Sequence, residues 1–254
     1  MNGMATLLRV GAPVAARRRL FCFPFAGGGA AAFRGWSRRL PPDVEVLSVQ
    51  LPGRESRIRE KPLDDIADIV AAARPAILAA SDLPYAIFGH SMGALVAFEL
   101  VLSLEQDPGR GPEHLFVSAR RSPEEPDVIP PVHALPDAEF MDKLQGRYGA
   151  IPEEVRKEPE LLELLLPPLR ADIRAIETYK RTSNRKVRCP IHVFGGSEDF
   201  HPKPSQLPGW QAVAEREIRV RLFPGNHFYL NAQEEALVAD MTATWANSSR
   251  KEHP

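Results

Sequence analysis

The segment Gly89-His90-Ser91-Met92-Gly93 carries the residues best suited to chemistry, in the pattern G-x-S-x-G. It directly follows an apolar run at residues 85–88 and precedes an apolar stretch with helical spacing at residues 94–104. In a strand-to-helix turn of this kind the serine occupies a strained backbone conformation, and flanking glycines leave room for the tight turn. We therefore predict that Ser91 is a nucleophile. The alternative is a structural turn in which the serine only caps the helix.

A serine hydroxyl needs a general base to become a good nucleophile near neutral pH. Among the seven histidines, His227 follows the last strand-like run and falls in a loop at the carboxyl end of the expected sheet. Loops at that edge meet the nucleophile turn in space. The ring of His90 should point away from the serine hydroxyl, and we expect His201 on the surface. The sequence thus predicts His227 as the base.

A carboxylate must hold the imidazole and stabilise its charged form. Asp199 ends the segment Gly195-Gly196-Ser197-Glu198-Asp199, which follows another strand-like run, and we choose it for this role. Glu198 remains an alternative, because alternation along a chain does not decide which of two neighbouring carboxylates points inward.

The glycine-rich segment Pro24-Phe25-Ala26-Gly27-Gly28-Gly29 follows an early strand-like run. Glycines let a backbone approach a ligand closely, so the N–H of Ala26 (or of Phe25) can join that of Met92 in an oxyanion hole. A phosphate-binding loop would end in Lys-Ser/Thr, which is absent, and a nucleotide hydrolase is therefore disfavoured.

Six short runs of apolar, β-branched and aromatic residues are typical of strands and must position these side chains: 20–23, 44–49, 85–88, 114–118, 191–194 and 218–222. Segments with helical spacing alternate with them, which indicates a mainly parallel sheet flanked by helices. With the serine turn, this predicts the α/β-hydrolase fold as a single domain over residues 1–254. Residues 122–186 contain no strand-like run, and we interpret them as a helical lid insertion.

Several helix boundaries are predicted from prolines and capping residues. Pro75 should kink or divide a helix that contains Ile66 and Ile77. Pro167-Pro168 should separate two lid helices at 160–166 and 169–179, with Pro168 in a first helical turn. Asn231 and Glu234 should form a capping box for a last helix that contains Leu237, Met241 and Trp245.

Composition excludes several classes of protein. The net charge of −1 over 254 residues gives no general attraction to nucleic acid or an anionic membrane. Cys22 and Cys189 lie in apolar runs that we interpret as strands, and we expect buried, reduced thiols. No His/Cys cluster has the spacing of a zinc site, so we expect no metal. No 18 apolar residues run together, and the N-terminal charges lie on the wrong side for a signal peptide. A cytoplasmic location is expected.

The sequence also resembles a known family, the type II (external, editing) thioesterases of polyketide and nonribosomal peptide synthesis. The resemblance covers most of the chain. Its most selective segments are Gln50-Leu51-Pro52-Gly53-Arg54-Glu55 and LPPLRAD at residues 166–172, beside the Ser91 turn, the glycine loop and the loops of Asp199 and His227. The family's triad falls on Ser91, Asp199 and His227. Many members carry His in place of Phe25, and we expect this departure to alter the pocket wall without removing catalysis.

The resemblance implies hydrolysis of acyl thioesters from the phosphopantetheine arm of acyl or peptidyl carrier proteins through an acyl-serine intermediate. It implies no cofactor, and free acyl-coenzyme A esters are further candidate substrates. A mobile lid would cover the site. Leucines 161, 162, 165 and 169 would line an acyl pocket, or else only pack the lid onto the sheet. We expect a monomer with no nucleic-acid or membrane partner.

Carrier proteins are typically acidic, so a basic rim would help them dock. Its candidates, which the sequence could equally place on an ordinary solvated surface, are Arg34, Arg38 and Arg39 on one predicted helix and Arg54, Arg57 and Arg59.

Three rival functions stay open from sequence. An oxygen-ester hydrolase would use the same three residues. A chain-releasing thioesterase cut from a larger synthase would share the fold, although no carrier-domain segment precedes the first strand-like run. A binding protein that reuses the fold without chemistry would be expected to lose a triad residue.

Overall fold

The computed structural model describes residues 6–11, 15–125, 129–149, 157–181 and 183–249. Within these ranges the centre is a seven-stranded sheet with the strand order β1-β3-β2-β4-β5-β6-β7, in which only β1 runs antiparallel to its neighbour. The strands are β1 (Thr6–Val10), β2 (Arg18–Phe23), β3 (Val44–Gln50), β4 (Tyr85–His90), β5 (His114–Ser118), β6 (Ile191–Gly196) and β7 (Arg219–Phe223). The predicted α/β-hydrolase architecture, a mainly parallel sheet flanked by helices, is confirmed.

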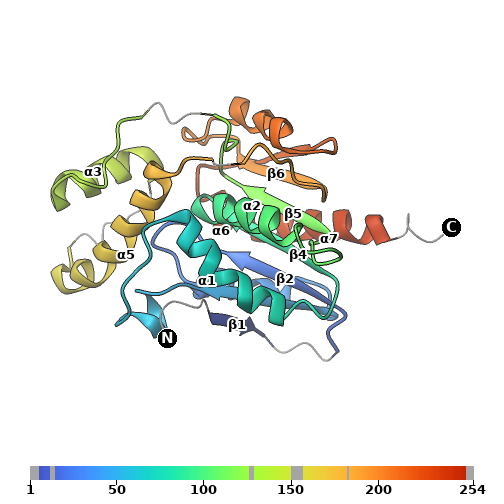
Figure 1. Ribbon diagram of the computed structural model, residues 1–254. Coiled ribbons are helices and arrows are strands. Elements are labelled where there is room, and N and C mark those ends of the chain that lie inside the picture. Colours follow the sequence, from blue (N-terminus) through green and yellow to red (C-terminus); the bar gives the residue numbers. More distant parts are fainter. Residues whose placement is uncertain (1–5, 12–14, 126–128, 150–156, 182, 250–254) are drawn as a thin grey trace.

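Helices cover both faces of the sheet (Figure 1). The α-helices are α1 (Ile66–Ala79), α2 (Met92–Leu104), α3 (Asp137–Tyr148), α5 (Pro159–Thr178), α6 (Tyr229–Ala232) and α7 (Glu234–Ser249). The 3₁₀ segments are η1 (Ala30–Phe33), η2 (Trp36–Arg38), η3 (Glu55–Arg57) and η4 (Pro204–Val213).

Alternation along the strands divides the core into two layers. In β2, Phe21 and Phe23 pack with α1, α2 and α5, whereas Leu20 and Cys22 pack on the opposite face with η1, η2 and α7. Helix α2 is buried on nearly all sides because it lies directly against the sheet. The nucleophile turn is therefore fixed between a central strand and the most buried helix.

Helices α3 and α5 lie between β5 and β6 in the chain, within the segment interpreted as a lid, and Figure 1 shows them together at one end of the sheet. Leu169 of α5 lies next to Gly27, which follows β2, so α5 reaches the carboxyl edge of the parallel strands. Leu161 is exposed, whereas Leu169 packs against the core.

The prolines interrupt less than expected. Helix α1 runs continuously through Pro75, and α5 is one helix that contains Pro167 and Pro168. The predicted division into two lid helices at Pro167-Pro168 was wrong, and of the two outcomes expected at Pro75, a kink or a division, the division does not occur. A proline removes one intrahelical hydrogen bond, and buried residues on both sides of Pro75, Ile69 and Ile77 among them, hold the helix together.

Other local predictions also need correction. Strand β1, the antiparallel edge strand, was not predicted from the sequence. Asn231 lies inside the short helix α6 and does not cap α7; the carbonyl of Gln233 instead accepts the first hydrogen bond, from Leu237 N. Cys189 is buried but precedes β6, and Cys22 is a free buried thiol in β2.

Candidate active site

Ser91 lies at the turn between β4 and α2 and has a strained backbone. Its φ is +54° and its ψ is −112°, a conformation that residues with side chains rarely adopt. A Cβ at Gly89 would lie 2.1 Å from Gly93 O, and one at Gly93 would lie 2.2 Å from Phe23 O. The two flanking glycines are therefore required by close approach of backbone. The Ser91 N–H also donates to Ser118 O at 2.8 Å, which ties the turn to β5.

Ser91, His227 and Asp199 form a continuous hydrogen-bonded chain of buried side chains. His227 Nε2 lies 3.0 Å from Ser91 Oγ, and His227 Nδ1 lies 2.9 Å from Asp199 Oδ2. An ionised carboxylate can only accept, so Nδ1 carries the proton and Nε2 is left as the acceptor for the serine hydroxyl. This is the tautomer that a general base at Nε2 requires.

The loops of Asp199 and His227 are joined directly to each other. Glu198 N donates to Gly225 O at 2.9 Å, and a Cβ at Gly196 would lie 2.3 Å from Asn226 O. The Glu198 side chain is exposed, whereas Asp199 is buried and also accepts from the His201 N–H at 2.9 Å. Of the two neighbouring carboxylates, the structure brings Asp199 to the imidazole.

Ala26 and Met92 each offer a backbone N–H near the carboxyl edge of the sheet. Met92 is the first residue of α2, where an N–H has no partner within the helix. Ala26 lies in a turn in which Gly28 N donates to Phe25 O at 2.9 Å. Among the described residues, neither the Ala26 N–H nor the Met92 N–H has a hydrogen-bond acceptor.

His90 lies behind the nucleophile and contacts other groups. Its Nδ1 lies 2.8 Å from Ser118 Oγ, which in turn lies 2.6 Å from the Tyr229 hydroxyl. Burial, and secondly the nearby His227, hold the pKa of His90 well below 6.5, so the ring stays neutral beside the imidazole of His227. Phe25 stacks edge-on against His90 and Phe228, with ring centroids 5.9 and 5.0 Å apart. Phe25, His90 and Phe228 thus form an aromatic cluster beside His227.

Three side chains near Ser91 were not foreseen as part of the site. Tyr148, at the end of α3, packs on His227 with ring centroids 4.8 Å apart. His201, expected on the surface, is partly buried, and its Nε2 accepts from Arg121 at 3.2 Å. Tyr148, His201 and Arg121 all line a cavity of about 10 Å³ beside Ser91 and His227. No sequence motif marks Tyr148, because only the three-dimensional path of α3 brings it to the imidazole.

The basic rim is smaller than predicted. Arg54 is buried and bonded to Asp172, so it is no surface group. Arg57 bonds to Glu60, and Arg39 bonds to Glu234 and Glu235. Residues 30–38 form two short 3₁₀ turns and not one helix. Three of the predicted arginines remain exposed without an acidic partner in the described part of the chain: Arg34, Arg38 and Arg59.

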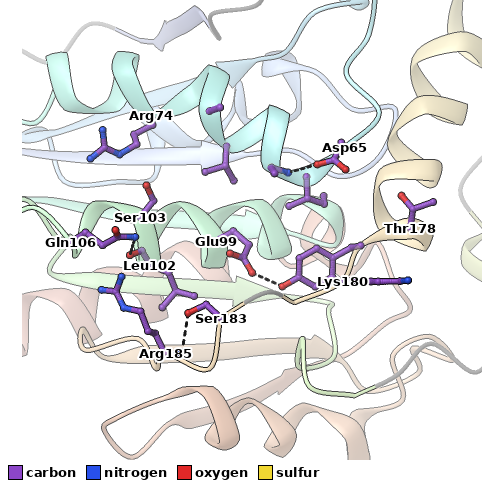
Figure 2. Close-up of a pocket in the computed structure, with 15 residues that line it drawn as sticks. Asp65, Arg74, Glu99, Leu102, Ser103, Gln106, Thr178, Lys180, Ser183 and Arg185 are labelled. Carbon is purple, nitrogen blue, oxygen red and sulfur yellow. Dashed lines mark hydrogen bonds between the residues drawn. The ribbon is translucent and has the colours of Figure 1, made fainter.

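A larger cavity, of about 550 Å³, lies between α1, α2 and the chain that follows α5 (Figure 2). Glu99 and Tyr179 form a hydrogen bond in it, and Arg74, Lys180 and Arg185 are among the residues that line it. None of Ser91, Asp199 and His227 lines it, so its size does not describe the space for an acyl group.

In the described ranges, no three His, Cys, Asp or Glu side chains are arranged to hold a metal ion, and no helix is long and apolar enough to span a membrane.

Comparison with known proteins gives a consistent family. Residues 18–244 match the thioesterase domain model. The chain is 40% identical over 227 residues to the gramicidin S biosynthesis protein GrsT of Aneurinibacillus migulanus, covering 89% of this chain and 88% of that protein. It is 38% identical over 229 residues to the thioesterase PikA5 of Streptomyces venezuelae, covering 88% and 79%.

A solved structure agrees with these relatives. The RedJ thioesterase of the prodiginine biosynthetic pathway in Streptomyces coelicolor superimposes with a TM-score of 0.83 at 36% identity, over 91% of this chain and 92% of that one.

Proposed function

The chain belongs to the thioesterase domain family, and from this premise we propose that it is a type II thioesterase that removes aberrant or stalled acyl groups from carrier proteins of polyketide or nonribosomal peptide synthesis. The observation that carries the reaction is the buried hydrogen-bonded chain from Ser91 through His227 to Asp199. The pathway is supported by the relatives, since GrsT is a gramicidin S biosynthesis protein and RedJ belongs to prodiginine biosynthesis.

In the proposed first half-reaction, Ser91 Oγ attacks the thioester carbonyl while His227 Nε2 takes its proton. The charge that forms on the imidazole is stabilised by Asp199, which keeps Nδ1 protonated. The Ala26 and Met92 N–H groups donate to the oxyanion, and the positive end of the α2 dipole adds to this stabilisation. The C–S bond then breaks, and His227 gives its proton to the departing thiolate of the phosphopantetheine arm.

In the second half-reaction, water attacks the acyl-serine and passes its proton to His227, which returns it to Ser91 Oγ as the acid leaves. The cavity of about 10 Å³ beside Ser91 and His227 supports this step, because it is at the lower limit of the space that one water molecule needs. Every proton transfer in the cycle is carried by His227, and the scheme uses no cofactor.

We propose that residues 122–186 act as a lid of a single hydrolase domain, and that acyl-coenzyme A esters are secondary substrates. We further propose a monomer that works in the cytoplasm, where the unpaired thiols Cys22 and Cys189 stay reduced. Light scattering after size-exclusion chromatography measures the oligomeric state; a dimer at micromolar concentration would overturn the monomer.

The test is release of acetyl and propionyl groups from a phosphopantetheinylated carrier protein, compared with the same acyl groups on coenzyme A and on an alcohol. We expect kcat/KM to be highest for the carrier protein and lowest for the oxygen ester. Fast turnover of oxygen esters with an untouched carrier protein would contradict the proposed role and favour an esterase.

A further inference from the structure

We propose that the buried ion pair between Arg54 and Asp172 positions the oxyanion loop, and that both are positioning residues for the thioesterase reaction. The inference rests on the proposed function, and it assigns a role to two residues of the sequence segments that most distinguish the family. The pair joins three segments that are far apart in sequence: the loop after β2, the loop after β3, and helix α5.

The ion pair is bidentate and fully enclosed. Arg54 Nη1 donates to Asp172 Oδ2 at 2.6 Å, and Arg54 Nη2 donates to Asp172 Oδ1 at 2.8 Å. Asp172 is 0% and Arg54 3% exposed. A buried ion pair contributes little net stability compared with apolar packing, because both charges lose their hydration. Its planar, forked geometry is suited to fixing the position of what it touches.

What the pair touches is the glycine loop. Asp172 Oδ2 also accepts from the Gly27 N–H at 2.7 Å, and Arg54 Nη1 donates to Gly28 O at 3.1 Å. The carboxylate and the guanidinium thus hold the loop through one donor and one acceptor of adjacent residues. Gln50 supports the arrangement, because its amide donates to Arg54 O at 2.9 Å and accepts from Ala30 N at 3.1 Å.

These bonds decide which N–H groups remain for an oxyanion. The Gly28 N–H donates to Phe25 O and closes a four-residue turn over residues 25–28. Gly27 is the third residue of this turn and has the positive φ, +74°, that a type II turn requires there. The Gly27 N–H is taken by Asp172. Within residues 25–28, only the N–H groups of Phe25 and Ala26 are left. Asp172 therefore sets the orientation of the turn from which the Ala26 N–H is offered.

The test compares Asp172→Asn with the wild type on an acyl thioester of N-acetylcysteamine, which needs no carrier protein. Asn keeps the shape but removes the charge, and its NH₂ group would face the guanidinium if its oxygen stays on Gly27. Complete loss of an oxyanion donor lowers kcat about 10²–10³-fold, so we expect a loss of about 10–100-fold from a displaced one. We expect KM within about twofold of the wild type, because the loop stabilises the transition state and not the bound ester.

Two further readouts separate positioning from a structural role. The apparent pKa of the kcat profile should equal that of the wild type, because the bonds of His227 to Ser91 and Asp199 are unchanged. The Gly27 amide resonance in a ¹H–¹⁵N spectrum should shift, since its acceptor loses the negative charge. Arg54→Lys is the milder variant: it keeps a charge but cannot form the fork and reach Gly28 O together, and a smaller loss of kcat is expected.

Asp240→Asn is the matched control. Asp240 is also a buried carboxylate bonded to arginines, Arg219 and Arg221, but it lies on α7 at the opposite face of the sheet. The Asp240→Asn variant should have a lower unfolding temperature than the wild type and an unchanged kcat. A folded Asp172→Asn with wild-type kcat, or an equal loss of kcat in Asp240→Asn, would overturn the proposal; if Asp172→Asn does not fold, Arg54→Lys decides by the same criteria. A wild type inactive on every thioester would instead overturn the proposed function.

Discussion

Asp199 Oδ2 lies 2.9 Å from His227 Nδ1, while the preceding side chain, Glu198, is exposed to solvent. The contact is held from both sides, because the backbone of residue 198 bonds to Gly225 and the second oxygen of Asp199 accepts the His201 N–H. The geometry thus assigns unequal roles to two adjacent carboxylates that sequence alone left open.

We predict that Asp199→Asn lowers kcat on the order of 10³-fold or more, because an amide no longer fixes the imidazole tautomer or stabilises its positive charge. Glu198→Gln is the matched control and should retain at least half of the wild-type kcat. Steady-state hydrolysis of one acyl thioester by both variants measures the difference. Equal losses in the two variants, or a larger one in Glu198→Gln, would contradict the assignment.

Gly93→Ala should destabilise the protein, since the added Cβ would meet the backbone oxygens of Phe23 and Pro24 at 2.2 and 2.6 Å. Backbone cannot move aside easily, and we expect a loss of about 2–3 kcal/mol in the free energy of unfolding. In Gly146→Ala, on helix α3, the new Cβ meets nothing within 4 Å, and a gain of about 0.5–1 kcal/mol is expected. Urea unfolding with unchanged m values gives both numbers; a stable Gly93→Ala would argue against so close a turn.

Acid should destabilise the fold through His114 and His192, whose rings share a hydrogen bond of 2.9 Å. Burial lowers the pKa of His114 from 6.5 to about 3 and that of His192 to about 4, with help from nearby arginines. The unfolded chain binds protons at these rings below pH 6.5, whereas the folded chain does so only near pH 4 and below. Stability is therefore full above pH 6.5 and falls between pH 6.5 and about 3.

The double variant His114→Phe His192→Phe should flatten that fall, because neither position can titrate. Urea midpoints at several pH values between 7 and about 4 compare the two proteins. Slopes identical to those of the wild type would mean that the pair does not cause the acid sensitivity.

The ring of Tyr148 should restrict the acyl group, since it packs on His227 and lines the small cavity beside Ser91. We predict that Tyr148→Ala raises the ratio of kcat/KM for a hexanoyl over an acetyl thioester by about tenfold, a size typical for one methylene-scale change in a pocket. Tyr148→Phe keeps the ring and should leave the ratio near that of the wild type. An unchanged ratio in Tyr148→Ala would place the acyl chain elsewhere.

Of the seven strands in the described part of the chain, six were predicted from the sequence, because each is a short run of apolar, β-branched and aromatic residues. The hydrogen-bonded residues Ser91, Asp199 and His227 were predicted from motif and chain order. Strand β1 was missed because this edge strand has no fully buried residue and lacks a continuous apolar run. Helix α5 was divided wrongly, since tertiary packing outweighs the hydrogen bonds lost at Pro167 and Pro168.

The ion pair of Arg54 with Asp172 shows another limit of the sequence. Both residues lie in the segments most selective for the family, but they are 118 residues apart, and nothing in either segment indicates that they form an ion pair. Read alone, Arg54 resembles a surface charge. A buried position can be inferred only when its partner is known.

The central claim is that Ser91 is the nucleophile, and it is tested most directly by comparing the wild type with Ser91→Ala on one acyl thioester while labelling with a fluorophosphonate. We predict that the wild type is labelled at Ser91 and loses thioesterase activity in proportion, and that Ser91→Ala is not labelled and retains less than about one-thousandth of kcat. Full turnover by a folded Ser91→Ala, or inactivating label at another residue, would contradict the assignment.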